Sequence, residues 1–397
     1  MKSCLEGVKI LEMSHFIAGP LCGQLLADMG AEIIKIERPG EGNGDAGREN
    51  APIYKGMSLY YAAYNRGKKT LTLDISKEDG KEIFRELVKE YDIIVQNFRP
   101  GTLEKMGLGY EDLKQINPKI IMTSISGYGQ YGPYRARAAL DMAIQAYSGY
   151  MSVTGFKDGP PTKSGPVISD FLGAIYAALG TVSAYTYREK TGLGQHVDVA
   201  LLDCMFTLLE NYPTAYLLTG EVPPRSGNGR PWTGPCGTYK TKDGYMHISG
   251  TQNNLFKKVC RAMGREDLID RPEFATPRLR KTNEEQIEPM IEAWMQNFTS
   301  DEAMAVLEEN GIPYGKVNTV EEITDDEHIQ AREMIVKIPD KTLGDFPVTA
   351  NPIKMSVAQM VYDIAPTFQG EFNEEILAKV LKLDNSKIEE LKKNGVI

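Results

Sequence analysis

The chain has 397 residues, of which 42% are hydrophobic and 25% are charged, a composition typical of a folded protein with more than one hydrophobic core. Its 45 Lys and Arg residues against 54 Asp and Glu residues give a formal net charge of −9, and an acidic surface repels polyanions, so we expect no nucleic-acid partner. Five scattered cysteines without a Cys-x-x-Cys pair, and no apparent secretory leader, predict reduced thiols in a cytoplasmic protein. The longest apolar stretch, 168–185, contains Asp170 and two glycines, so we expect no membrane span.

The first 125 residues alternate between short apolar runs and amphipathic segments, which is the pattern of a parallel sheet covered by helices. We predict strands at 8–11, 31–37, 70–73, 93–95 and 119–125, and helices at 20–29, from Ser76 onward and at 110–116. Ligands of such sheets bind beyond the carboxyl ends of the strands. The loops that follow these strands are therefore the first place to look for a site.

The second half of the chain predicts a long helix from Asp170 to Lys190, a helix over 201–218 and a boundary in the breaker-rich stretch 220–237. Two short runs, 237–240 and 245–248, flank a Lys-Asp-Gly turn and predict a hairpin. Helices near 252–263, 283–297 and 301–310 follow it, which indicates a smaller α+β unit. Two more helices, near 371–381 and 385–394, close the chain.

Basic residues lie near several predicted strand ends: Arg38, Arg66, Lys68, Lys69, Arg99 and Lys105. If they converge on one edge of the sheet, their donors suit a small phosphorylated ligand. The alternative is that they are solvated charges at loop ends. The four histidines have neither His nor Cys partners at metal-ligand spacing, so we expect no metal site. The chain has no Walker loop and no Gly-x-Ser-x-Gly elbow, which removes the main support for nucleotide-kinase and hydrolase functions.

One carboxylate lies in an apolar setting, Asp170 at the start of the long helix. Backbone amides and the helix dipole are expected to favour its ionised form there, and an ionised carboxylate can attack an activated acyl group. The alternative is that Asp170 only caps the helix.

A series of short motifs, in this order and spacing, resembles the class III coenzyme A transferases (the CaiB/BaiF family), which include formyl-CoA transferase and crotonobetainyl-CoA:carnitine transferases. The motifs are 5–11, 18–20, 30–37, 97–101, 126–129, 145–149 and 190–200, and the resemblance covers nearly the whole chain. It implies an α/β fold with a Rossmann-like large domain, residues 1–222 and 326–397, and a small α+β domain, residues 223–325. It also implies an interlocked homodimer.

The resemblance implies a CoA-transferase that moves coenzyme A from an acyl-CoA donor to a free carboxylic acid. Asp170 matches the family's catalytic aspartate, on which an aspartyl anhydride and an aspartyl-CoA thioester would form. CoA and acyl-CoA would be substrates, with no tightly bound cofactor. The positions that match the family's CoA contacts are His15, Ala18, Arg38, Leu73, Asn97, Phe98, Arg99 and Lys105. Ile17 replaces a glutamine of formyl-CoA transferases, which argues against a formate or oxalate pocket.

Two alternatives stay open. The related α-methylacyl-CoA racemases need a histidine before the aspartate at position 141, and Leu140 occupies that place here, which disfavours proton transfer next to the thioester. A catalytically silent CoA-binding protein is the other. The acids themselves are open as well: carnitine-type, bile-acid, succinate and 2-hydroxy-acid acceptors all fit the sequence.

Overall fold

A computed structural model describes residues 2–397, which form two compact units. The large unit contains the residues up to Ser148, together with Gly165–Leu208 and His328–Ile397. The small unit contains Gly149–Ser164 and Leu209–Glu327. Each unit is described below by itself, and the domain boundaries drawn from the sequence stay a prediction.

The large unit is built on a sheet of six parallel strands in the order β5-β2-β1-β6-β7-β8. The strands are β1 Lys9–Met13, β2 Glu32–Glu37, β5 Lys68–Thr72, β6 Ile93–Gln96, β7 Ile121–Ser126 and β8 His196–Ala200. The first five confirm the predicted strands. The sixth, β8, was missed because His and Asp alternate with Val along it, and this half-buried edge strand lacks the apolar run that marks the others.

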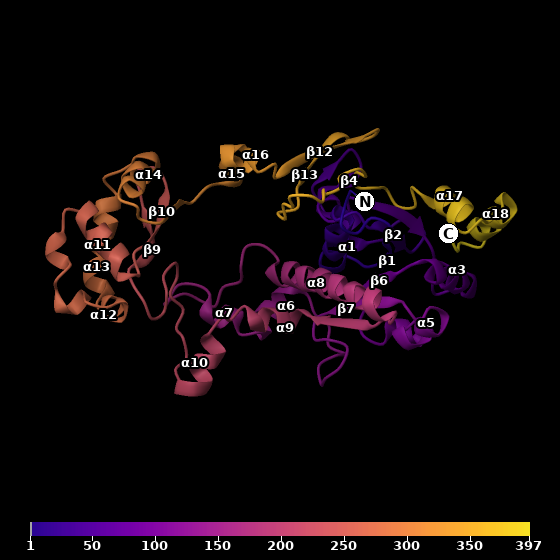
Figure 1. The fold of residues 1–397 in the computed structure, drawn as a ribbon, viewed down its shortest axis with the longest axis horizontal. Coiled ribbons are helices and arrows are strands. Elements are labelled where there is room, and N and C mark those ends of the chain that lie inside the picture. Colours follow the sequence, from indigo (N-terminus) through magenta and orange to yellow (C-terminus); the bar gives the residue numbers. More distant parts are fainter. Residues whose placement is uncertain (1) are drawn as a thin grey trace. The chain divides into compact units, whose positions relative to one another are not determined.

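Helices cover both faces of this sheet. On one face α1 (Ala18–Asp28) packs against α8 (Ile168–Thr191), which also contacts β7, β8 and α9 (Leu201–Thr207). On the other face lie α3 (Glu78–Glu90), α5 (Tyr110–Ile116), α17 (Asn373–Glu375), a π-helical turn at Ile376–Val380 and α18 (Asn385–Lys393). Figure 1 shows the two C-terminal helices, in yellow, beside α3, and their Leu377 and Leu391 share one core with Phe84 of α3.

Helix α8 approaches the sheet closely because its inner face is made of small residues, among them Gly173, Ala174 and Ala177. A Cβ on Gly173 would lie 2.2 Å from Cδ2 of Leu201, so any larger residue there would require the Leu201 side chain to move. The helix ends at Gly192, whose φ of +76° is a left-handed cap, as its position after Lys190 predicts. Within residues 2–397, α8 is the single helix long and apolar enough to cross a membrane by length and composition alone.

The predicted helix over 201–218 is wrong as one element. It is divided into α9 and α10 (Tyr212–Thr219), because Glu210 adopts a left-handed φ of +53° and Pro213 occupies the first turn of α10. The remaining elements are short: β3 Ile53–Tyr54, β4 Met57–Ser58, α2 Leu59–Ala62, α4 Thr102–Lys105, α6 Asp141–Tyr147, α7 Tyr150–Val153, α16 Glu327–Ala331, β12 Ile335–Asp340 and β13 Gly344–Thr349.

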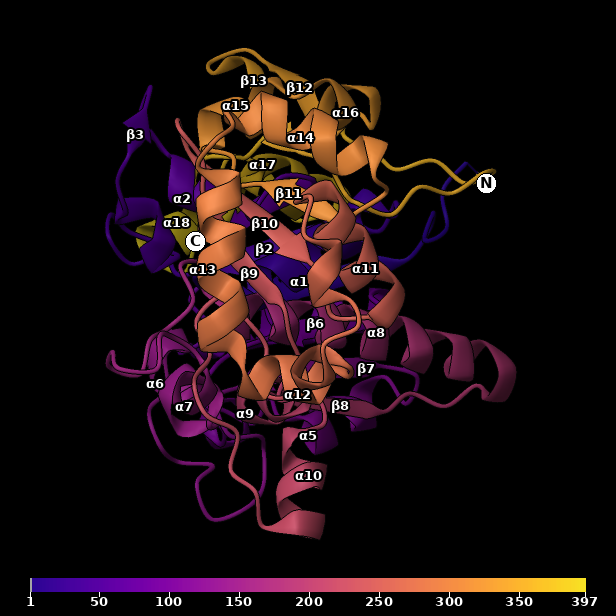
Figure 2. The same cartoon turned by 90° about the vertical axis from the view of Figure 1, so that its left-hand side faces the viewer.

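The small unit holds an antiparallel sheet in the order β11-β10-β9. Strands β9 (Cys236–Lys240) and β10 (Tyr245–Ser249) confirm the predicted hairpin, and β11 (Tyr314–Lys316) completes the sheet. Helices α11 (Asn253–Ala262), α13 (Glu284–Met295) and α14 (Ser300–Glu309) lie over one face of the sheet (Figure 2) and bury Met246 and Ile248 of β10. Two shorter helices are α12 Pro277–Thr282 and α15 Val320–Asp325.

Candidate active site

A cavity of about 240 Å³ lies at the carboxyl ends of four neighbouring parallel strands, β1, β2, β5 and β6. His15 lines it from the chain beyond β1, Arg38 from beyond β2, Leu73 from beyond β5 and Phe98 from beyond β6. Adjacent parallel strands bring their ends to one edge, which is why residues so distant in sequence meet there. Four of the eight residues that the resemblance assigns to CoA therefore line one cavity.

The other four assigned residues differ in their placement. Asn97 holds the loop after β1, because its Oδ1 accepts from the backbone N of His15 at 2.9 Å and its Nδ2 donates to the His15 carbonyl at 2.8 Å. Ala18 is buried in the first turn of α1. Arg99 and Lys105 are exposed and do not line the cavity, so the structure does not bring them to it.

The loop 14–17 has an unusual backbone that polar groups keep in place. Phe16 adopts a left-handed φ of +63°, and its backbone N donates to Oδ1 of Asp45 at 2.9 Å. The His15 ring packs edge-on against the Phe98 ring, with the ring centroids 5.7 Å apart. Burial, together with the charge of Lys35, lowers the pKa of His15, so its imidazole is neutral at pH 7.

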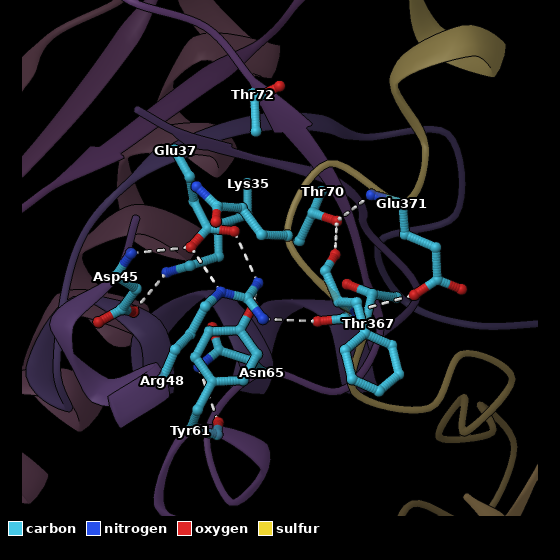
Figure 3. A network of polar contacts seen from close by, with 12 residues as sticks. Lys35, Glu37, Asp45, Arg48, Tyr61, Asn65, Thr70, Thr72, Thr367 and Glu371 are labelled. Carbon is cyan, nitrogen blue, oxygen red and sulfur yellow. Dashed lines mark hydrogen bonds and ion pairs between the residues drawn. The ribbon is translucent and has the colours of Figure 1, made fainter. Parts of the chain in front are cut away.

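Beneath this loop the buried charges of Lys35, Asp45 and Glu12 form a network, part of which Figure 3 shows. The Lys35 Nζ lies 3.0 Å from both Glu12 Oε1 and Asp45 Oδ2, and it donates to the Ser14 carbonyl at 2.8 Å. Although burial opposes it, the three nearby carboxylates raise the pKa of Lys35, and the Lys35 charge in turn lowers the pKa of Asp45. The loop is therefore fixed by an ionised network with no solvent exposure at these three side chains.

The predicted cationic edge is wrong for Arg66, Lys68 and Lys69. These residues lie at or just before the start of β5, at the opposite edge of the parallel sheet from the cavity. Each is paired with a carboxylate: Arg66 with Asp28 at 2.7 Å, Lys68 with Glu12 at 2.8 Å, and Lys69 with Glu375 at 2.9 Å. Of the six basic residues, only Arg38 lines the cavity, where its Nε lies 3.6 Å from an Asp74 oxygen.

Asp170 is the third residue of α8 and lies close to Asp141, the first residue of α6. Burial and the negative charge of Asp141 raise the pKa of Asp170 to about 7, so the expectation that the helix start favours the ionised form is wrong. Within residues 2–397 no hydrogen bond to the Asp170 carboxylate is present. Asp141, by contrast, accepts from Ser169 N at 2.8 Å, from Ser169 Oγ at 2.7 Å and from Gln145 Nε2 at 2.6 Å.

Two tyrosines connect Asp170 with the loop after β1. The rings of Tyr64 and Phe171 are in edge contact, and Tyr60 contacts Tyr64 in the same way. Burial and the charges of Asp170 and Asp45 raise the pKa of Tyr60 to about 12, so both carboxylates lie within electrostatic reach of one phenol. Asp170 therefore lies near Tyr60 and Tyr64, whereas neither tyrosine lines the cavity at the strand ends.

The sequence model of CoA-transferase family III matches residues 5–371. A succinyl-CoA–D-citramalate CoA-transferase of Chloroflexus aurantiacus is 38% identical over 395 residues, 99% of this chain and 98% of that relative. A succinate–glutarate CoA-transferase of Agrobacterium fabrum is 33% identical, over 97% of this chain and 98% of that relative. A solved CaiB/BaiF family protein from Brucella suis has a TM-score of 0.85 at 36% identity and covers 96% of this chain and 100% of its own.

The chain belongs to CoA-transferase family III.

This membership confirms the resemblance drawn from the sequence motifs and the α/β fold class, and it makes the protein an enzyme that transfers CoA. Substrates of such enzymes are CoA thioesters and carboxylic acids. In this family III transferase the sheet edge that carries the cavity is the edge where α/β proteins bind their ligands.

Sequence reasoning missed several groups around this site. Tyr60 and Tyr64 gave no signal, because their position beside Asp170 depends on packing between segments far apart in the chain. Glu12 and Lys35 could have been recognised in the sequence. Each is a charged residue inside an otherwise apolar predicted strand, and such a residue is buried only with a partner of opposite charge.

Proposed function

We propose that this CoA-transferase works through covalent intermediates on Asp170 and exchanges CoA between two dicarboxylic acids. The observation that carries the proposal is the setting of Asp170: a half-buried carboxylate without hydrogen-bond donors, at a helix start, whose pKa is raised to about 7. A desolvated carboxylate of this kind is only weakly stabilised when ionised, which makes it a better nucleophile toward a thioester.

The first half-reaction removes the donor acid. The Asp170 carboxylate attacks the thioester carbonyl, the C–S bond breaks, and CoA leaves as a thiolate with a mixed anhydride left on Asp170. The thiolate then attacks the aspartyl carbonyl of the anhydride, which expels the donor acid as a carboxylate and leaves an aspartyl-CoA thioester.

The second half-reaction repeats these steps in reverse with the acceptor. The acceptor carboxylate attacks the aspartyl thioester and releases the CoA thiolate, which gives a second anhydride. The thiolate attacks the acceptor carbonyl, so that acceptor-CoA leaves and the Asp170 carboxylate is restored. No proton is gained or lost in either half, so the site needs to exclude water rather than supply an acid or a base.

CoA binding is assigned to the cavity at the strand ends. His15, Leu73 and Phe98 offer it apolar and aromatic surface, and Arg38 offers a charge-assisted donor for a phosphate. Asn97 and Ala18 act through the loop and helix start that they hold, while exposed Arg99 and Lys105 can reach only the outer phosphates. Tyr60 lies within electrostatic reach of Asp170, and we assign the thioester of a bound acyl-CoA to the space beside this carboxylate.

Dicarboxylic acids are proposed because the relatives described above are named for succinyl-CoA with citramalate and for succinate with glutarate. Ile17, which is buried at the start of α1, gives this region an apolar side chain and disfavours the smallest acids. Succinyl-CoA is therefore the first donor to test.

The proposal includes a homodimer. Phe171, Ile175, Leu179 and Tyr187 project from α8 at helical spacing and are each 38% to 60% exposed, which is a large apolar stripe for a lone chain. A second copy of the chain is the expected partner. Light scattering coupled to size-exclusion chromatography should give twice the mass of one chain, and the mass of a single chain would contradict this part of the proposal.

The decisive experiment traps the covalent intermediate. The enzyme is mixed with succinyl-CoA, acetyl-CoA or a longer acyl-CoA, quenched with hydroxylamine, digested and analysed by peptide mass spectrometry. We expect a hydroxamate on the peptide that carries Asp170, formed with succinyl-CoA, absent in Asp170→Ala and retained in the matched control Asp203→Asn on α9. Absence of the hydroxamate with every donor, while CoA still binds, would contradict the mechanism and favour a racemase or a silent CoA-binding protein.

A further inference from the structure

A thiol, an imidazole and a hydroxyl lie together on the small unit, and the proposed transfer reaction uses none of them. Cys236 and Thr238 are on β9 and His247 is on β10, on the face of the sheet opposite to the buried Met246 and Ile248. Thr238 pairs directly with His247 in the antiparallel register, and Cys236 is two residues before Thr238, so all three side chains share that face.

The three groups are arranged as a nucleophile, a base and an orienting group. The Sγ of Cys236 lies 3.7 Å from Nε2 of His247, and the Oγ1 of Thr238 lies 3.1 Å from Nδ1 of the same ring. When Nδ1 of His247 carries the ring proton, this N–H donates a hydrogen bond to the Thr238 hydroxyl oxygen. The other ring nitrogen, Nε2, then keeps a lone pair that can accept the thiol proton. A thiol with a base in reach and the base held by a third group has the geometry of an activated nucleophile.

Cys236 also lines a cavity. Cys236 is half-buried and, with Thr238, lines a cavity of about 490 Å³ beside the edge strand β9. The lining is strongly acidic: within residues 2–397 it includes Glu284, Glu285, Glu288 and Glu292 of α13, and Lys281 is its one basic residue. Lys281 is itself paired with Glu284. Anionic reagents, acyl-CoA and CoA disulfides among them, are therefore repelled, and small neutral molecules are admitted.

We propose that Cys236 is a reversible oxidation site that reacts with small neutral hydroperoxides. His247 takes the thiol proton, the thiolate sulfur attacks the near oxygen, an S–O bond forms and the O–O bond breaks. The departing hydroxide, or the alkoxide of an alkyl hydroperoxide, takes the proton from His247 and leaves as water or as the alcohol. Sulfur is oxidised by two electrons to a sulfenic acid and the peroxide is reduced. One added thiol converts the sulfenic acid to a mixed disulfide with loss of water, and a second thiol releases the cysteine from that disulfide.

The test uses the full-length enzyme and an internal standard. Cys4 is exposed and has Met355, but no imidazole, beside it, so it reports the reactivity of an ordinary surface thiol. The enzyme is treated with hydrogen peroxide in the presence of dimedone, and dimedone labelling of each cysteine is followed in time by peptide mass spectrometry. We expect Cys236 to be labelled about tenfold faster than Cys4, less than the roughly 100-fold that a positioned base can supply because Cys236 is half-buried.

Two variants separate the role of the base from simple exposure. His247→Gln should bring the ratio of the two labelling rates to about one or below, and Thr238→Val should lower it to an intermediate value. A ratio at or below one in the unaltered enzyme would overturn the proposal, as would a ratio that neither variant changes. If His247→Gln does not fold, the Thr238→Val result decides.

A second readout tests the acidic lining. The rate of alkylation by neutral iodoacetamide, divided by the rate for anionic iodoacetate, should be several times larger at Cys236 than at Cys4, since Cys236 lines one cavity together with the four glutamates and Cys4 does not. Equal ratios at the two cysteines would overturn the assigned preference for neutral reagents. Because neither readout uses CoA transfer, the outcome is independent of the proposed function.

Discussion

Replacing Asp170 with asparagine is expected to stabilise the protein while it abolishes CoA transfer. The pKa of Asp170 is raised from 3.8 to about 7 in the folded chain. At about 1.4 kcal/mol per pKa unit, holding this carboxylate ionised above pH 7 costs about 4 kcal/mol. Asparagine has nearly the same shape and no charge, so it removes this cost. Because the amide leaves its own polar atoms without partners, we expect a net gain of about 2 to 4 kcal/mol at pH 8.

The stability difference between Asp170→Asn and the unaltered enzyme should depend on pH. A pKa that is raised on folding means that the folded chain binds the proton more tightly than the unfolded chain, so protonation of Asp170 stabilises the unaltered enzyme as the pH falls from about 7 to about 4. The advantage of Asp170→Asn is therefore largest above pH 7 and vanishes below about pH 4. Urea unfolding at pH 8 and at pH 5 should show this advantage shrink by about 2.6 kcal/mol.

Asp203→Asn is the matched control. Asp203 lies in the first turn of α9, as Asp170 does in α8, but its side chain is exposed. Burial and the charge of Asp198 raise the pKa of Asp203 as well, but solvent screens this exposed carboxylate, so the free energy of unfolding of Asp203→Asn should change by no more than about 0.5 kcal/mol at either pH. The reasoning is refuted if Asp170→Asn is no more stable than the unaltered enzyme at pH 8, or if its advantage is the same at pH 5.

Three further predictions follow from the charges around the site. Asp141→Asn removes the negative charge beside Asp170, so the midpoint of the pH–rate profile should move below about 7; an unchanged midpoint would contradict the assigned cause. Lys35→Met leaves buried carboxylates without their partner and should lower the free energy of unfolding in urea by about 3 to 5 kcal/mol, whereas a loss under about 1 kcal/mol would show that the network contributes little. Arg38→Gln should raise KM for acyl-CoA about tenfold with kcat nearly unchanged, as expected for one charge-assisted contact, and an unaltered KM would remove Arg38 from the CoA site.

The strands that could be predicted from the sequence are those that are buried in the sheet. Strands covered on both faces are rich in apolar residues, and the five predicted strands of the large unit carry such residues, although Glu12 interrupts β1, Lys35 interrupts β2 and threonines alternate with Leu71 in β5. Strand β8 and the hairpin of β12 and β13 are half-exposed, so polar residues interrupt them and the signal is lost. The break between α9 and α10 depended on one left-handed residue, Glu210, which propensity does not mark.

The sequence could predict those residues of the site that follow a strand, because all strands of a parallel sheet end at the same edge. Arg38 and Leu73 directly follow a strand and Phe98 follows one after Asn97, and the structure brings all three to one cavity. Lys68 and Arg66 precede a strand, and the direction of a parallel sheet alone would have assigned them to the other edge. The pKa of Asp170 could not be foreseen, because the residue that raises it, Asp141, lies 29 positions earlier and approaches only through the packing of α6 against α8.

The environment of Asp170 also affects the free energy of the proposed covalent intermediates relative to that of the free carboxylate. In the anhydrides and in the aspartyl-CoA thioester the carboxyl group of Asp170 carries no charge, whereas the free carboxylate does. Burial and the neighbouring charge of Asp141 disfavour only the ionised state. The same free energy of about 4 kcal/mol that raises the pKa therefore favours acylation of Asp170 over its free form. A site with donors aimed at this carboxylate would lower its pKa and lose that advantage, which gives a physical reason for a catalytic carboxylate without hydrogen bonds.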